Sequence, residues 1–119
     1  MQNFRDLKVW SKAHAVVIAV YAATEPFPAA ERFGLTSQMR RAASSIPANI
    51  AEGCGRSSNA DLARFLHIAL GSASELDYFL LLARDLKFLK PPIHDDLRAN
   101  VQEVKRMLGG LIGRVRTDD

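Results

Sequence analysis

The sequence predicts an all-α protein, an up-and-down four-helix bundle. Three of the four expected helices carry apolar residues at unbroken steps of three and four, and no segment shows the alternation of a half-buried strand. The connections are short, so consecutive helices run antiparallel. With 119 residues, 48% of them hydrophobic, the chain is long enough for one domain, residues 1–119, with its own core.

The first helix is expected over about residues 6–23. Residues three or four apart would face the core: Leu7, Trp10, His14, Val17 and Tyr21. The proline-containing segment that starts at Glu25 ends the helix, because a residue before proline avoids the helical region. Val16, Ile18 and Val20 are apolar as well, and one bundle cannot bury them together with that stripe. Such surplus apolar surface favours a homo-oligomer.

The second helix, expected over about residues 36–52, is predicted to kink at Pro47. An interior proline removes one backbone hydrogen bond and costs about 3 kcal/mol. The kink either shapes a binding or subunit surface or only fits the helix to its neighbours. Gly53 and Gly55 are good terminators for this helix.

The third and fourth helices have clear starting signals. Ser58 is the predicted N-cap of the third helix, with Asp61 in the capping-box position. Small residues in the middle of this helix would allow another helix to approach closely. Pro91 and Pro92 suit the first turn of the fourth helix, and Gly109 and Gly110 should loosen its last turns.

The predicted core draws on all four helices. Its members are Leu7, Trp10, Val17, Tyr21, Met39, Ile46, Ile50, Leu62, Leu66, Leu76, Leu80, Leu97, Val101 and Val104.

The formal net charge of +3 lies mostly in the second helix, with a further basic stretch in the fourth. Arginine suits phosphate recognition, so five arginines are candidate nucleic-acid-binding residues: Arg40, Arg41, Arg56, Arg106 and Arg114. Ser45, Asn49 and Glu52 share a face with Arg41 and Arg56 and are candidate oligomer-interface residues. Glu52 and Arg56 can also pair at i, i+4. A merely solvated face is the alternative for these charges.

No catalytic or metal-binding constellation is predicted, so we expect a non-enzyme without a cofactor. His14 and His67 lie on or near apolar stripes and are expected in the core, whereas His94 is expected to be exposed at a helix start. Cys54, the single cysteine, has no evident base partner and no partner for a disulfide. Glu75 and Asp77 are two apart on a helix, so they point in different directions.

The sequence predicts a cytoplasmic protein with no membrane partner. No signal-type apolar region follows the first residues. The apolar run over residues 15–23 is too short to span a bilayer.

Four stretches of the chain carry a resemblance to a known family. They are Phe4-Arg-Asp-Leu-Lys-Val-Trp10, Tyr21 with Phe27-Pro28, residues 33–53, and residues 65–76. The most specific part is Ser45-Ile-Pro-Ala-Asn-Ile-Ala-Glu-Gly53. Together they resemble the four-helix-bundle proteins encoded in intervening sequences of bacterial 23S rRNA genes, also labelled the S23 ribosomal protein family. The chain is similar to the accessory proteins of diversity-generating retroelements as well.

The resemblance implies a cytosolic homo-oligomer, a pentameric ring by analogy with relatives, with no known catalysis and with RNA or DNA as the partner. Binding would depend on phosphate contacts and salt, because Trp10, Tyr21 and most phenylalanines are needed in the core and cannot stack bases. The alternative is a structural or protein-interaction module with no nucleic-acid role.

Overall fold

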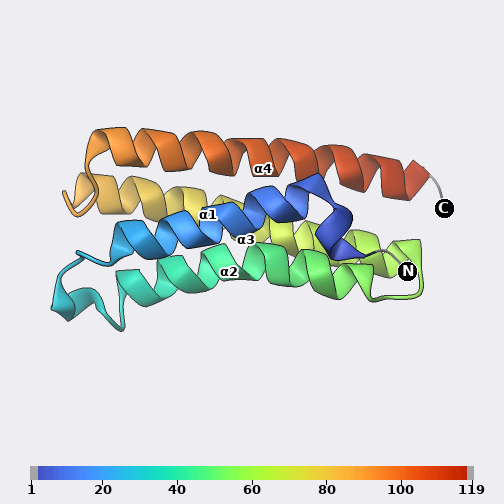
Figure 1. The fold of residues 1–119 in the computed structure, drawn as a ribbon, viewed down its shortest axis with the longest axis horizontal. Coiled ribbons are helices and arrows are strands. Elements are labelled where there is room, and N and C mark those ends of the chain that lie inside the picture. The colour runs from blue at the N-terminus through green and yellow to red at the C-terminus, as the bar shows by residue number, and fades with distance from the viewer. Residues whose placement is uncertain (1–2, 118–119) are drawn as a thin grey trace.

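The computed structural model describes residues 3–117, and within them it contains helices and no strand. The four helices are α1 (Lys8–Thr24), α2 (Leu35–Cys54), α3 (Asn59–Asp85) and α4 (Pro91–Thr117), and two short 3-10 turns are η1 (Phe4–Asp6) and η2 (Ala29–Glu31). The helices lie side by side along a body of 46 × 23 × 20 Å (Figure 1). Each packs on the next, and α1 packs on α4. The predicted up-and-down bundle is confirmed.

The helix starts follow the sequence signals. The Ser58 hydroxyl accepts the backbone N–H of Asp61 at 3.1 Å, as predicted for the N-cap of α3. Pro91 is the first residue of α4, where its missing N–H has no intrahelical acceptor to lose. Gly109 and Gly110 do not end α4, which continues to Thr117. Pro47 lies buried inside α2, which runs through it to Cys54.

The core matches the prediction on α2, α3 and α4. The predicted residues that are buried there are Met39, Ile46, Ile50, Leu66, Leu76, Leu80, Leu97, Val101 and Val104. Leu62 packs against this core but is only half-buried. These helices therefore follow one apolar stripe each, as the period of 3.6 residues requires.

The predicted core stripe of α1 is wrong at Tyr21, and its other members, Leu7, Trp10 and Val17, pack only against the edge of the core. The core-facing residues of α1 are Val9, Ala13, Val16, Val20 and Thr24. Tyr21 is 46% exposed, and Trp10, Val17 and Leu7 are only half-buried. Both stripes obey the helical period, but the small side chains of the first allow α1 to approach its neighbours closely, whereas the rings of Trp10 and Tyr21 would hold it away.

The predicted positions of the histidines are also wrong. His14 and His67 are exposed on α1 and α3, outside the buried stripes of those helices. His94 is buried, with 3% of its surface exposed. It lies three residues before Leu97 and therefore shares the core face of α4.

Candidate nucleic-acid interface

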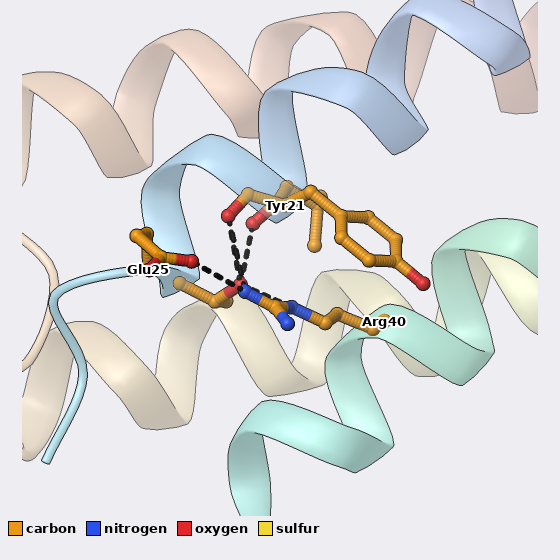
Figure 2. A network of polar contacts seen from close by, with 5 residues as sticks. Tyr21, Glu25 and Arg40 are labelled. Carbon is orange, nitrogen blue, oxygen red and sulfur yellow. Dashed lines mark hydrogen bonds and ion pairs between the residues drawn. The ribbon is translucent and has the colours of Figure 1, made fainter. Parts of the chain in front are cut away.

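Arg40 is built into the fold rather than presented to a ligand (Figure 2). Its Nε donates to the hydroxyl of Thr24 at 2.9 Å, and its Nη2 donates to the carbonyl of Tyr21 at 3.3 Å and pairs with Glu25 at 3.5 Å. The guanidinium also lies 4.5 Å from the centre of the Tyr21 ring. The last carbonyls of a helix lack intrahelical donors and carry partial negative charge. Arg40 therefore ties α2 to the C-terminal end of α1.

Arg41 lies on another part of α2, and Arg56 lies in the connection between α2 and α3. Arg41 is exposed and donates to Gln38 at 2.6 Å. Arg56 forms the predicted i, i+4 pair with Glu52, at 3.4 Å, which is confirmed. Its guanidinium lies 4.8 Å from the centre of the Phe65 ring, which also contacts Arg64 at 4.6 Å. Arg40, Arg41 and Arg56 therefore do not converge on one site.

The candidate oligomer-interface residues are divided between the bundle interior and its surface. The hydroxyl of Ser45 lies 2.9 Å from that of Ser72 on α3, and both residues are half-buried. Asn49 donates to the carbonyl of Ser45 at 2.8 Å and to its hydroxyl at 2.9 Å. Glu52 is exposed. Ser45 and Asn49 thus form a polar link between α2 and α3 within one chain.

Arg106 and Arg114 do meet, in an open groove between the start of α1 and α4. Two adjoining depressions of about 480 Å³ and 310 Å³ form it, and both contact Leu7, Lys8 and Met107. We call this feature the α1/α4 groove. Its charged lining residues are Lys8, Lys12, Arg106 and Arg114 as cations and Asp6 and Glu103 as carboxylates.

The charges in the α1/α4 groove are only partly paired. Arg106 forms an ion pair with Glu103. The hydrogen bond from Arg106 holds the pKa of the Glu103 carboxyl below its usual value, and the same bond raises the pKa of Arg106. Lys8 and Arg114 are exposed and form no ion pair within residues 3–117. The groove therefore keeps free positive charge at both helices.

Lys8 and Lys12 were missed as site residues. They lie four apart on α1 and so share one side of it. That side faces α4, away from the stripe that contains Trp10 and Tyr21. The i, i+4 spacing was visible in the sequence, but its meaning depended on placing the correct stripe of α1 in the core.

The described residues hold no grouping of His, Cys, Asp and Glu that could bind a metal ion. Cys54 is buried, and burial raises the pKa of its thiol, which lowers the thiolate fraction that a nucleophile needs. Among the described helices, α3 is long and apolar enough to cross a membrane by length and composition alone. In this fold its stripe of Leu66, Leu76 and Leu80 is buried in the bundle core.

These features define a class of protein: a small up-and-down four-helix bundle with an open, charged groove on its surface. The family model of the 23S rRNA-intervening sequence proteins matches residues 5–110, and the chain belongs to this family. The expected resemblance is confirmed. The structure is also similar to that of a protein of unknown function from the S23 ribosomal protein family of Bacteroides thetaiotaomicron VPI-5482. The two share 25% sequence identity with a TM-score of 0.79, over 87% of this chain and 97% of the other. Comparison with curated proteins gives no match.

Proposed function

We propose that this protein is a non-enzymatic homo-oligomer that binds the phosphate backbone of RNA or DNA along the α1/α4 groove. The observation that carries the proposal is the meeting of Lys8, Lys12, Arg106 and Arg114 in one open groove. Cations along a groove neutralise successive phosphates and release their counterions. The family name, which refers to intervening sequences of 23S rRNA, supports a partner of this class.

The groove favours phosphate contacts over base stacking. No aromatic residue is among the described residues that line it. Binding should therefore show little sequence preference and should weaken steeply as salt rises. One groove carries only a few cations, so each subunit binds weakly. In an oligomer, of which a five-membered ring is our proposed form, repeated grooves raise the affinity by avidity.

The test measures the binding of fluorescently labelled RNA and DNA to the protein by fluorescence anisotropy at several salt concentrations. The variant Lys8→Ala/Arg106→Ala/Arg114→Ala should lose binding to all sequences and reduce the salt slope by about one per removed phosphate contact. The matched control is Arg41→Ala/Arg64→Ala/Arg84→Ala, which removes three arginines that do not line the groove and should bind like the wild type. Wild-type protein that retains neither RNA nor DNA at low salt would overturn the nucleic-acid proposal.

The second candidate function is a structural or protein-interaction module without nucleic acid. Exposed apolar side chains on two helices favour it, among them Ile18 on α1 and Tyr78 on α3, which are 59% and 57% exposed. Large exposed apolar surface commonly marks a contact with another protein. An oligomer that assembles fully and yet binds no nucleic acid would select this second function.

A further inference from the structure

One carboxylate of the α1/α4 groove has no partner in the chain. Asp6 and Lys8 are the two charged residues that line both depressions of the groove. Asp6 is exposed, and its side chain forms no ion pair and no hydrogen bond within residues 3–117. The other carboxylate of the groove, Glu103, is paired with Arg106. The groove therefore contains one acceptor that is free for a ligand.

The Asp6 side chain is held at the groove by a short anchored turn. Asp6 ends η1, where its backbone N–H donates to the carbonyl of Asn3 at 3.1 Å. The ring of Phe4, also in η1, packs against Trp10 of α1 with centroids 4.9 Å apart. The start of α1 lies beside the C-terminal half of α4 (Figure 1). The fold therefore keeps Asp6 next to the cations of α4.

An unpaired carboxylate weakens the binding of any chain of phosphates. Like charges repel, and this repulsion acts over the same short range as the attraction of Lys8 and Lys12. A groove that only collected phosphates would bind them better without Asp6. An ionised carboxylate only accepts hydrogen bonds, so it favours a polyanion only when the polyanion supplies a donor.

The sugar supplies that donor in RNA and not in DNA. Each ribose has a 2′-hydroxyl, which donates and accepts hydrogen bonds, whereas the sugar-phosphate backbone of DNA has no donor. Aspartate and glutamate accept the ribose 2′-hydroxyl in the dinucleotide-binding sites of another fold. A hydrogen bond to a carboxylate is also stronger than one between neutral groups. Asp6 therefore has the right chemistry to recognise the sugar of RNA.

The positions of Asp6 and Lys8 match the layout of an RNA strand. The 2′-hydroxyl and the 3′-phosphate are carried by neighbouring carbons of one ribose, so they reach neighbouring protein groups. Asp6 and Lys8 are two residues apart and line the same two depressions, and Arg114 lines one of them. A phosphate held by Lys8 and Arg114 would bring its ribose within reach of Asp6.

We propose that Asp6 makes the α1/α4 groove selective for RNA over DNA by accepting a ribose 2′-hydroxyl. This inference rests on the proposed function and names which nucleic acid the groove prefers. DNA would meet the same cations and the same carboxylate, without a donor to offset the repulsion. RNA should therefore bind about tenfold more tightly than DNA of the same sequence at equal salt.

A purely structural role of Asp6 makes a different prediction. A carboxylate near the start of a helix stabilises its positive end, and Asp6 comes two residues before the first residue of α1. That role affects the thermal midpoint of unfolding and leaves the relative affinity for RNA and DNA unchanged. The ratio of the two affinities is therefore the informative measurement.

The test compares three fluorescently labelled strands of one sequence by anisotropy at one salt concentration. They are an oligouridylate, the corresponding oligodeoxyuridylate and a 2′-fluoro form of the oligouridylate. Fluorine at the 2′ position keeps the sugar close to its shape in RNA but removes the O–H donor. The wild-type protein should bind the RNA about tenfold more tightly than either of the other two strands.

Two substitutions of Asp6 should reduce the preference for RNA in steps. Asp6→Ala removes the acceptor and the charge, so the three strands should bind equally, and the DNA should bind about threefold more tightly than to the wild type. Asp6→Asn keeps an uncharged acceptor and should give an intermediate ratio. Asp6 is exposed, so both variants should keep the helix content of the wild type by circular dichroism.

Two other carboxylates provide matched controls. Glu103→Gln frees Arg106 in the same groove, so it should raise the affinity for all three strands and leave their ratio unchanged. Glu75 is an exposed residue of α3 that lines neither depression and forms no ion pair within the described part of the chain. Glu75→Gln should therefore leave all three affinities unchanged.

Four results would overturn the inference. Equal binding of the three strands by the wild type would show that the sugar is not recognised, while the proposed function would stand. A 2′-fluoro strand that binds as tightly as RNA would show that the shape of the sugar is recognised and not its donor. An unchanged ratio in Asp6→Ala would assign the recognition to another residue. If the wild type binds none of the strands at low salt, the proposed function itself is wrong, and the inference falls with it.

Discussion

The two flanks of α1 use their positive charges in different ways. On the α2 flank, Arg40 donates to Thr24 and Tyr21 and pairs with Glu25. Its guanidinium is therefore occupied by partners at the C-terminal end of α1. On the α4 flank, Lys8 and Arg114 line an open groove and have no ion pair within the described part of the chain. The difference is set by what each cation finds nearby. Where unpaired backbone carbonyls are in reach, an arginine becomes structural.

We expect substitution of Arg40 to change the free energy of unfolding more than any other substitution on the two flanks of α1. Arg40→Ala should lower the free energy of unfolding by about 2–3 kcal/mol, because it removes charged hydrogen bonds to acceptors at the end of α1. Arg40→Lys should not restore it, since one ammonium cannot reproduce the planar fork of donors. Urea unfolding followed by circular dichroism measures both.

The control for Arg40 is Arg114→Ala, which should stay within about 0.5 kcal/mol of the wild type because Arg114 is an exposed residue of the groove. Equal losses at Arg40 and Arg114 would mean that the two flanks of α1 do not differ in the way described.

Substitution of Thr24, the acceptor of the Arg40 hydrogen bond, should have the next largest effect on the free energy of unfolding. Thr24 is buried, its hydroxyl donates to the carbonyl of Val20 at 2.8 Å, and it accepts from Arg40. Thr24→Val should cost about 1–2 kcal/mol, because it leaves the Nε donor of Arg40 without its acceptor. In a double-mutant cycle with Arg40→Ala the two losses should not add. Strict additivity would show that the bond between them contributes nothing.

His94 contrasts with Thr24, because it is a buried polar side chain of which only one ring nitrogen has a hydrogen-bond partner. Its Nδ1 lies 2.9 Å from the carboxylate of exposed Asp95, while its Nε2 is buried and has no hydrogen-bond partner among residues 3–117. His94→Leu should therefore keep or raise the free energy of unfolding, by up to about 1 kcal/mol, since an unsatisfied buried atom is removed. Chemical unfolding of the two variants side by side checks the contrast. A loss comparable to that of Thr24→Val would show that His94 is satisfied in solution.

Most of the fold could be predicted from the sequence, because α2, α3 and α4 each have one dominant apolar stripe. Ser58 and Pro91 also mark clearly where α3 and α4 begin. It did not resolve α1, where two apolar stripes have the same period and only packing against the neighbours selects between them. Side-chain size was a poor guide there, since the smaller Ala13 and Val16 are buried, whereas Trp10 is half-buried at the edge of the core and Tyr21 is exposed.

The candidate site was partly predictable for the same reason. Arg106 and Arg114 follow the exposed side of α4, which its clear stripe defines. Lys8 and Lys12 could be recognised as site residues only after it was known which face of α1 is buried in the core. The role of Arg40 depends on the hydroxyl of Thr24, 16 residues earlier in the chain, and on the carbonyl of Tyr21, 19 residues earlier, and no local pattern encodes these contacts.

The smallest predicted effect on stability is also the finest probe of the α1/α4 groove. Glu103→Gln removes the carboxylate that pairs with Arg106. The pKa of Glu103 is lowered in the fold, so the ion pair stabilises above the ordinary pKa of a glutamate and is lost only as pH falls through the lowered value. Arg106 is exposed and Glu103 is half-buried at the surface, where solvent screens such a pair, so unfolding at pH 7 should hardly change. Nucleic-acid affinity should instead rise, with a steeper salt dependence, because Arg106 becomes free to meet a phosphate. Anisotropy titrations of wild type and Glu103→Gln at two salt concentrations measure this.

Asp85→Asn, which removes a surface carboxylate paired with Arg84 on α3, is the matched control and should leave binding unchanged. Unchanged affinity in Glu103→Gln would place the phosphate contacts away from Arg106.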